Sequence, residues 1–302
     1  MRVFVTGASG WIGSAVVPEL IAAGHGVTGL ARSDASAAAL TAAGAQVQRG
    51  DLGDLDSLRA GAENADGVIH LAFNHDFSDY LGAGRTERAA VETFGDVLAA
   101  SDRPFLFASG VALLAPGRLA TERDVSPMVG PDSPRGGGEN LALGFADNGV
   151  RSVSLRFAPT VHGEGDHGYV STLVGVARER GASGYVGDGS NRWPAVHRRD
   201  AARMIALALE NAPAESNLHA VGEEGIATRD IAEAIGRGLG VPTVSIAPDD
   251  AEQHFGWIGR FFSVDVPASS AVTQELLGWT PTYPTLLEDL EAGYYFRSAA
   301  AA

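Results

Sequence analysis

Residues 2–13 read RVFVTGASGWIG, an apolar β-branched run that leads into three glycines spaced G-x-x-G-x-x-G and then into an apolar helical stretch. This pattern predicts a strand, a tight turn and the start of a helix, the arrangement that holds a dinucleotide pyrophosphate. The unpaired N–H groups of the first helical turn would face the anion. A tight turn without a ligand is the alternative. The predicted cofactor contacts here are Gly7, Ser9, Gly10, Trp11, Ile12 and Gly13.

The composition limits the class of protein. The chain has 302 residues, 45% of them hydrophobic, enough for one large α/β domain or two smaller ones. A formal net charge of −15 would repel nucleic acid and anionic membranes, so we expect a small-molecule partner and neither of those. The chain opens on a core strand and holds no long apolar run, so we expect no signal peptide and a cytoplasmic location. It has no cysteine, which excludes disulfides and thiolate chemistry.

Strand-like and helix-like segments alternate along the first half of the chain, as a right-handed βαβ series requires. The strands are short and mostly apolar throughout, which is typical of strands covered on both faces. We therefore predict an α/β fold with a Rossmann-type, doubly wound parallel sheet. The predicted strands are 3–6, 26–30, 45–48, 67–71, 104–108 and 152–156, and the predicted helices between them are 11–23, 35–42, 54–60, 86–100 and 135–148.

The second half differs in composition, with Gly, Asp, His and Tyr gathered at 161–169 and helical patterns near 170–180, 200–210, 271–278 and 284–293. This half is interpreted as a smaller, mostly helical lid that interleaves with the main sheet. The predicted NAD(P)-binding Rossmann domain is residues 1–160, with returns to it around 184–220. The predicted substrate-binding lid is residues 161–183 and 221–302.

The end of the second strand predicts which nicotinamide dinucleotide binds. Arg32 and the Ser33 hydroxyl lie where a 2′-phosphate would sit, which favours NADP(H) over NAD(H). Asp34 is the complication, because a small shift of the turn would bring its carboxylate to a ribose hydroxyl instead. A solvated surface charge is the other explanation for Arg32.

Later strand ends supply further predicted cofactor contacts. Asp51 would accept a hydrogen bond from the adenine amino group while Leu52 packs on the ring, although an N-cap role for Asp51 is nearly as plausible. Small Ala72 would leave room for the ribose. The remaining predicted contacts are Leu71, Phe73, Pro159 and Val161.

Several motifs together resemble the short-chain dehydrogenase/reductase superfamily, in its extended or atypical branch near the NAD-dependent epimerase/dehydratase-like proteins. They span nearly the whole chain and are far more specific than the first turn alone. The matching stretches are TGASGWIG (6–13), GDL (50–52), HLA (70–72), FASG (107–110), LRFAPTVHG (155–163), WPAVHRRDAA (193–202) and LGWTP (277–281).

The resemblance implies hydride transfer near the ends of the fifth and sixth strands, with a Ser or Thr and a Tyr followed four residues later by Lys. This chain departs from that pattern, because residues 131–140 contain neither Tyr nor Lys. Either Arg135 and Glu139 take the Tyr and Lys places, or Pro131 and Arg135 do. Arginine is too basic to donate a proton but can polarise a carbonyl.

The catalytic candidates are Ser109, with Gly110 as the rival position, Arg135, and a proton donor. For the donor we favour Tyr169, with His162, His167, His75 and Tyr80 as alternatives. No spacing typical of a metal site appears. The predicted substrate contacts are Asn74, His75, Phe77, His167 and Trp193.

These residues favour an NADP(H)-dependent oxidoreductase that reduces a carbonyl or related C=X group of a small molecule, with a non-standard proton donor. One alternative is a catalytically silent NADP(H)-binding sensor or scaffold. Another is a sugar-nucleotide epimerase or dehydratase, for which Arg178, Arg180 and Arg192 would be the basic residues. The sequence does not determine the oligomeric state, although helices 86–100 and 135–148 could pair across a two-fold axis in a homodimer, as the resemblance implies.

Overall fold

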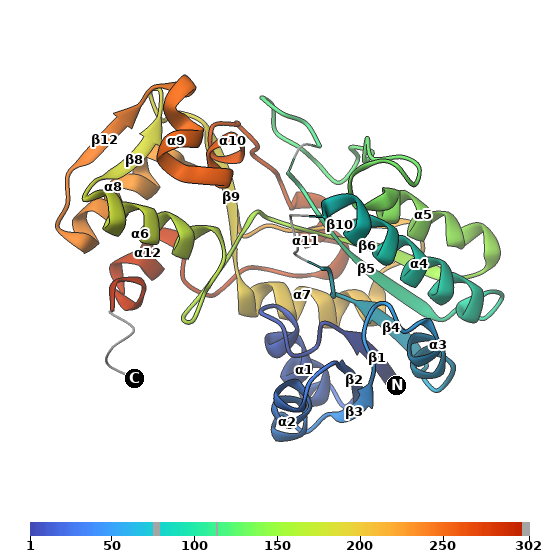
Figure 1. Cartoon of the computed structure of the whole chain (residues 1–302). Coiled ribbons are helices and arrows are strands. Elements are labelled where there is room, and N and C mark those ends of the chain that lie inside the picture. Colours follow the sequence, from blue (N-terminus) through green and yellow to red (C-terminus); the bar gives the residue numbers. More distant parts are fainter. Residues whose placement is uncertain (75–78, 113, 298–302) are drawn as a thin grey trace.

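The computed structural model describes residues 1–74, 79–112 and 114–297. Figure 1 shows a large sheet with helices on both faces and, beside it, a smaller body of helices and short strands. His75 and Phe77, two of the predicted substrate contacts, lie outside the described residues.

The large sheet has seven parallel strands in the order β10-β6-β5-β4-β1-β2-β3. The predicted doubly wound Rossmann-type sheet is confirmed. Because β1 pairs with both β2 and β4, the strand order reverses beside β1, and the carboxyl edge at such a reversal is where doubly wound sheets bind their ligands. The strands are β1 (Arg2–Thr6), β2 (Gly26–Ala31), β3 (Gln46–Arg49), β4 (Gly67–His70), β5 (Pro104–Gly110), β6 (Arg151–Phe157) and β10 (Ser216–Ala220).

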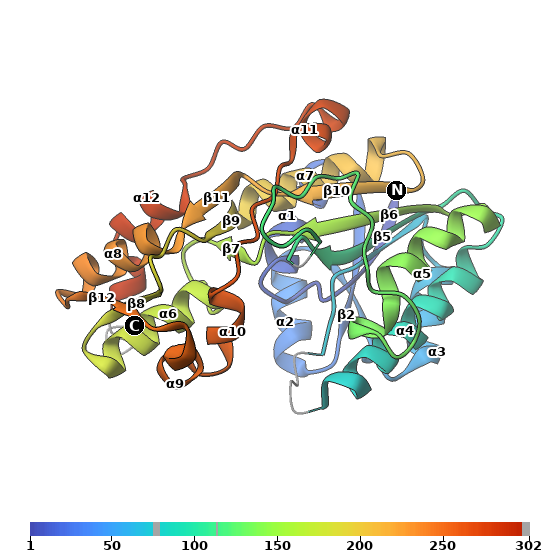
Figure 2. The same ribbon diagram turned by 90° about the horizontal axis from the view of Figure 1, so that it is seen from above.

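Helices cover both faces of this sheet. Along β1, Val3 and Val5 belong to one apolar cluster and Phe4 to another, as the alternation of a strand requires. Figure 2 shows α4 and α5 on one side of the sheet and α1 and α7 on the other. The helices are α1 (Gly13–Ala22), α2 (Asp34–Ala42), α3 (Leu55–Glu63), α4 (Tyr80–Leu98), α5 (Gly138–Gly144), α7 (Arg198–Asn211) and α11 (Ala271–Leu277).

Three features differ from the sequence-based expectation of six strands and five crossover helices. A seventh strand, β10, lies at the edge and pairs only with β6, and its sequence SNLHA has one large apolar residue and so lacks a strand signal. Helix α4 begins at Tyr80 rather than near residue 86. The predicted helix 135–148 is broken into α5 between two 3-10 turns, Pro134–Gly137 and Phe145–Asn148.

We call the smaller body the cap. It holds a three-stranded sheet, β11-β9-β7, and a two-stranded one, β12-β8, around an apolar cluster that includes Trp193 and Phe262. The domain boundaries predicted above stay a prediction. The cap elements are β7 (Thr160–His162), α6 (Tyr169–Arg180), β8 (Ser183–Val186), β9 (Arg192–His197), β11 (Glu223–Ala227), α8 (Thr228–Leu239), β12 (Thr243–Ile246), α9 (Ala251–Phe255), α10 (Gly259–Phe262) and α12 (Leu286–Glu291).

Within the part of the chain that the structure describes, no helix is both long enough and apolar enough to cross a membrane.

Candidate active site

The glycine turn after β1 is shaped to receive an anion. Gly7 has a φ of +67°, and a Cβ there would lie 2.7 Å from the backbone nitrogen of Ala72 on the neighbouring strand end. A Cβ on Gly13 would overlap the carbonyl oxygen of Gly7, so α1 packs directly on the turn. Helix α1 has neither a side-chain cap nor an acidic residue in its first turn. The N–H groups of Ser14 and Ala15 donate to the carbonyl oxygens of Gly10 and Ile12, so a ligand would be met by the N–H groups that precede them in the turn. These residues fit a dinucleotide pyrophosphate.

The same turn is fastened to the cap. Trp11 donates from Nε1 to the carbonyl oxygen of Val161 at 2.7 Å, and the Cζ of Arg198 lies 4.3 Å from the centroid of the indole. Arg198 forms no ion pair with any described residue. Its guanidinium therefore adds a cation beside the glycine turn. Sequence analysis missed Arg198, and the only signal was the basic pair Arg198-Arg199 directly after the mostly apolar residues 193–197.

At the end of β2, Arg32 is exposed and has no ion-pair partner among residues 1–74, 79–112 and 114–297. The Ser33 hydroxyl caps α2 by accepting from the N–H of Ser36 at 3.1 Å. Asp34 is engaged by Arg49, which also donates to the Ser33 carbonyl oxygen at 2.6 Å. Two guanidinium groups, those of Arg32 and Arg49, therefore lie at neighbouring strand ends. Sequence analysis missed Arg49.

The segment after β3 decides whether Asp51 caps the next helix. The Asp51 carboxylate accepts from the N–H of Gly53 at 2.7 Å, whereas Asp54 caps α3. The N-cap role considered for Asp51 is therefore wrong, because the helix begins three residues later than that role requires. Leu52, Leu71, Ala72 and Phe73 are half-buried at this edge, and Asn74 is exposed.

His70, at the end of β4, lies behind this edge. Its Nδ1 is 2.8 Å from the Thr6 hydroxyl, and its ring is stacked on Phe107. Burial, with a smaller effect of the Arg135 charge, lowers the pKa of His70 to about 3. This imidazole is neutral at physiological pH and serves the packing of the sheet.

Ser109, at the end of β5, is held by a buried carboxylate. Its hydroxyl donates to Glu139 Oε2 at 2.7 Å, and the other oxygen of Glu139 accepts from Ser154 at 2.9 Å and from Arg156 at 2.5 Å. Glu139 and Arg156 form an ion pair and are buried. In this arrangement the Ser109 proton is directed into the protein.

Arg135 lies on the 3-10 turn before α5 and points toward α4. Its guanidinium forms a two-pronged ion pair with Glu87, a buried carboxylate of α4. The Cζ of Arg135 is 4.7 Å from the ring centroid of Phe73 and 5.5 Å from that of Phe107. A guanidinium over two aromatic faces and beside a carboxylate is strongly positioned. Arg135 thus lies beside the end of β4.

A small cavity separates the carboxyl edge of the sheet from the cap. The Tyr169 ring meets the Trp193 ring edge to face at 5.3 Å, and the Trp193 Nε1 is satisfied by the carbonyl oxygen of Val264 at 3.1 Å. Burial raises the pKa of Tyr169. His167 packs on Trp11 rather than on this cavity. The cavity is lined by Ala112, Pro159, Tyr169, Trp193, Phe261, Val264 and Val266.

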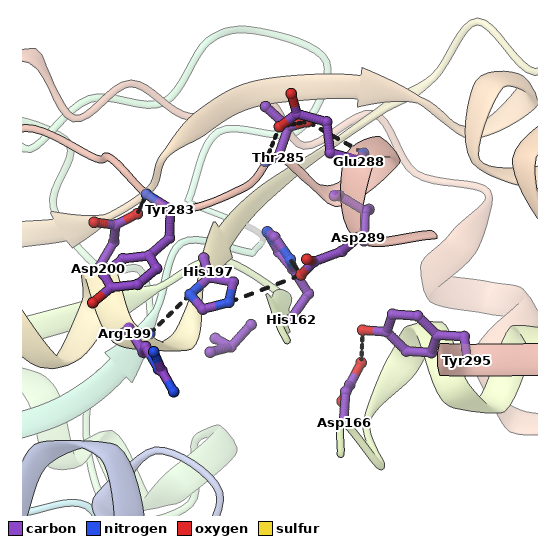
Figure 3. Close-up of polar contacts among 12 residues, drawn as sticks. His162, Asp166, His197, Arg199, Asp200, Tyr283, Thr285, Glu288, Asp289 and Tyr295 are labelled. Atoms are coloured by element: carbon purple, nitrogen blue, oxygen red, sulfur yellow. Dashed lines mark hydrogen bonds and ion pairs between the residues drawn. The ribbon is translucent and has the colours of Figure 1, made fainter. Parts of the chain in front are cut away.

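His162 joins β7 to α12 inside the cap. Its Nδ1 is 2.6 Å from Asp289, and its ring meets His197 edge to face at 5.4 Å (Figure 3). His162 is fully buried. Burial alone would raise the pKa of Asp289, but the hydrogen bond from His162 and other favourable contacts hold it below its usual value. Figure 3 also shows, to the right of His162 and Asp289, the hydrogen bond that the Tyr295 hydroxyl donates to Asp166.

Across the described residues, no group of three or more His, Asp or Glu side chains has a geometry that would hold a metal ion.

The fold and the glycine turn define a Rossmann-type dinucleotide-binding protein. The sequence profile of the NAD dependent epimerase/dehydratase family matches residues 3–221. The chain belongs to this family, which is NAD(P)-binding, and the resemblance to the extended short-chain dehydrogenases/reductases is confirmed.

Similar proteins match from 70% to 98% of the chain. It is 49% identical to Uncharacterized protein C2A9.02 of Schizosaccharomyces pombe, over 98% of this chain and 100% of the relative. It is 28% identical to 4-hydroxy-2-methyl-3-oxo-4-farnesyl-3,4-dihydroquinoline-1-oxide ketoreductase of Stigmatella aurantiaca, over 70% of this chain and 66% of the relative. The structure of UDP-glucose 4-epimerase from Thermotoga maritima with UDP-glucose matches with a TM-score of 0.75 at 21% identity, covering 98% of each chain. That structural likeness shows the fold alone.

Proposed function

We propose that this chain is an NADP(H)-dependent reductase that acts on the carbonyl group of a small apolar compound. A bound reduced nicotinamide would supply the hydride. The glycine turn, Arg32 and Arg198 would hold the dinucleotide across the sheet edge, and the cap would exclude water from the reacting carbonyl.

The preference for NADP(H) is supported by the charges at the end of β2. Arg32 has no acidic partner among the described residues, and Asp34, the group that would favour a ribose hydroxyl, is paired with Arg49. A guanidinium binds a phosphate with two parallel hydrogen bonds, which suits a 2′-phosphate.

The observation that carries the choice of substrate is the apolar lining under the cap, around a cavity that in this structure has room for about one water molecule. Its lining is aromatic and aliphatic, and Arg178, Arg180 and Arg192 do not line it. Arg192 is paired with Asp265 at 2.9 Å, Arg180 donates to the Gln253 carbonyl oxygen at 2.7 Å, and Arg178 reaches the Phe296 carbonyl oxygen at 3.4 Å. An apolar surface fits an apolar ring or chain better than a nucleotide sugar with its two phosphates. The Stigmatella aurantiaca relative is named as a ketoreductase of a farnesyl-bearing compound, which agrees with this choice.

The test is the consumption of NADPH, followed by its absorbance, with a panel of aliphatic and aromatic ketones, aldehydes and nucleotide sugars. We expect turnover with apolar carbonyl compounds and none with the sugars. Conversion of a nucleotide sugar without net consumption of NADPH would contradict the proposal and favour an epimerase.

A matched pair of variants ties the activity to the cavity. Phe261→Ala opens the cavity wall and is expected to change KM for the apolar substrate several-fold while KM for NADPH stays the same. Leu276→Ala on α11 is the control, because Leu276 and Phe261 are equally exposed, at 42%. Equal effects of the two variants would argue against the cavity as the substrate site.

A further inference from the structure

Two tyrosines from different parts of the molecule border the candidate active site. Tyr80 is the first residue of α4, and Tyr169 is the first residue of α6 in the cap. Tyr80 packs against Phe73 at the end of β4, with ring centroids 6.2 Å apart, and Tyr169 lines the cavity under the cap. The two phenols are close enough for charge on Tyr80 to raise the pKa of Tyr169, a smaller effect than burial.

The positive charge of Arg135 acts on Tyr80, whereas no cation of the described residues has a comparable effect on Tyr169. Tyr80 and Glu87 are seven residues apart on α4, which is two helical turns, so they lie on the same face. Arg135 pairs with Glu87 and stacks over Phe73, which Tyr80 also contacts. Burial raises the pKa of Tyr80, the positive charge of Arg135 opposes that rise, and Glu87 adds to it. Burial and the charge of Tyr80 both raise the pKa of Tyr169.

The backbone at Arg135 indicates that its side chain is needed there. Arg135, Gly136 and Gly137 all have left-handed dihedral angles, with φ values of 55°, 58° and 63°. Glycine adopts this conformation without a steric penalty, whereas a side chain does not. Of the three consecutive left-handed positions, one keeps a long, charged side chain. Strain of this kind clusters at functional sites. The same φ region is also adopted by Ala100, Asp102 and Glu215. The role of Arg135 is therefore inferred from its contacts with Glu87 and Phe73.

Contacts with α4 hold the turn in this conformation. A Cβ on Gly136 would lie 2.5 Å from the carbonyl oxygen of Gly84, and Arg88 donates to the Gly136 carbonyl oxygen at 2.9 Å. The turn and the first half of α4 are therefore one packed unit, and this unit sets the position of Arg135 relative to Tyr80.

We propose that Tyr80 is the catalytic proton donor of this site and that Arg135 is the positioning residue that stabilises its phenolate. This inference rests on the proposed reductase function. The hydride that bound NADPH would supply forms the new bond to the carbonyl carbon, and the Tyr80 hydroxyl gives its proton to the carbonyl oxygen. The phenolate then takes up one proton from the solvent, so the reaction consumes one proton in total. The resulting products are an alcohol and NADP⁺. Arg135 itself stays protonated throughout, since a guanidinium does not release its proton.

This assignment accounts for the missing Tyr and Lys. The phenol and the cation that the resemblance places on one helix would come here from two elements, the start of α4 and the turn before α5. Ser109 is unsuited to the same task in this arrangement, because its proton is given to Glu139.

The kinetic test removes one hydroxyl at a time. Tyr80→Phe is expected to lower kcat at least 100-fold, within the range for loss of a general acid, with the affinity for NADPH unchanged. Tyr185→Phe is the control, because Tyr185 is a cap tyrosine that also lies beside an arginine, with Arg229 at 5.0 Å from its ring. The control is expected to keep wild-type kcat. A Tyr80→Phe variant with at least half of the wild-type kcat, or a 100-fold loss confined to Tyr169→Phe, would overturn the proposal.

A second measurement needs neither substrate nor cofactor. The Tyr80 resonance of tyrosine-labelled protein, assigned by its loss in Tyr80→Phe, is titrated by NMR in wild type, Arg135→Lys and Arg135→Gln. We expect the pKa of Tyr80 to rise in Arg135→Gln and to return toward wild type in Arg135→Lys. An Arg135→Gln/Glu87→Gln double variant avoids a buried unpaired carboxylate if the single variant does not fold, and the same rise is expected relative to Glu87→Gln alone. An unchanged Tyr80 titration in these comparisons would overturn the role of Arg135.

The two measurements separate this inference from the proposed function. If no carbonyl compound is reduced but Tyr80 responds to Arg135, the reductase proposal fails and the coupling of the two residues stands. If reduction proceeds but Tyr80→Phe is fully active, the reductase proposal stands and the donor assignment fails.

Discussion

The hydroxyl of Ser109 donates a hydrogen bond of 2.7 Å to the carboxylate of Glu139. Glu139 is buried and also accepts from Arg156, so it stays a carboxylate acceptor that draws the Ser109 proton away from the sheet edge. A residue at the end of β5 that resembles a catalytic serine is thus part of a buried polar network.

Ser109→Ala is expected to lower kcat less than tenfold, because the proton for the substrate comes from elsewhere. It is also expected to cost about 1–2 kcal/mol in the free energy of unfolding, because Glu139 loses one of its donors. Steady-state kinetics and urea denaturation measure the two effects. A loss in kcat as large as that of Tyr80→Phe would contradict this account of Ser109.

Arg32→Gln is expected to weaken NADPH binding about 10- to 100-fold, the loss of about 1.5–3 kcal/mol from hydrogen bonds to a charged group, and to leave NADH binding unchanged. Calorimetric titration with each nucleotide measures both. The control is Arg59→Gln, since Arg59 is a half-exposed arginine of α3 whose nearest carboxylate, Asp96, is 4.0 Å away. Parallel losses for NADPH and NADH in Arg32→Gln would be incompatible with a 2′-phosphate contact.

Gly13→Ala is expected to disrupt the glycine turn, because the new methyl group would overlap the Gly7 carbonyl oxygen and the backbone of Ala8. Nucleotide binding should be lost or reduced more than 100-fold, about 2.7 kcal/mol or more. Gly175→Ala within α6 is the matched control, because a Cβ there meets no atom within 4 Å. That control should stabilise the protein by up to about 1 kcal/mol. Near-normal nucleotide binding by Gly13→Ala would show that the glycine turn does not bind the nucleotide.

Asp289→Asn is expected to destabilise the cap, by about 1–3 kcal/mol at neutral pH, because the fully buried His162 loses a charged partner. The folded-state pKa of Asp289 lies below its usual value of 3.8. Its carboxylate therefore stabilises the fold above that usual value, and the contribution disappears as the pH falls through the folded-state pKa. The difference between wild type and variant in urea denaturation should shrink below about pH 4.

The control for this comparison is Glu288→Gln, at the neighbouring exposed residue. Glutamine can replace glutamate in the capping box that Glu288 forms with Thr285, so little change is expected. A difference between wild type and Asp289→Asn that is constant with pH would contradict the ionised role of Asp289.

Local signals in the sequence were sufficient for the fold. The six predicted strands are mostly apolar segments, and all six lie in the observed sheet. β10 was missed because it is a polar edge strand whose partner is far away in the sequence, Ser216 pairing with Val153. The broken helix after residue 134 was missed because Arg135 adopts a left-handed conformation only where α4 packs against the turn.

Only the part of the site that belongs to local sequence motifs could be predicted. The glycine turn and Arg32 belong to local motifs and are present at the expected edge. Arg198, Arg49, Glu87 and Glu139 have no motif of their own, and their positions depend on long-range contacts such as that between Arg135 and Glu87. A single sequence contains no periodicity that reports such contacts.

The most direct test of the account is a calorimetric titration of the wild-type chain with NADPH and with NADH. The account predicts binding of both through the glycine turn, with NADPH about 10- to 100-fold tighter because of Arg32. No heat with either nucleotide, or tighter binding of NADH, would contradict it.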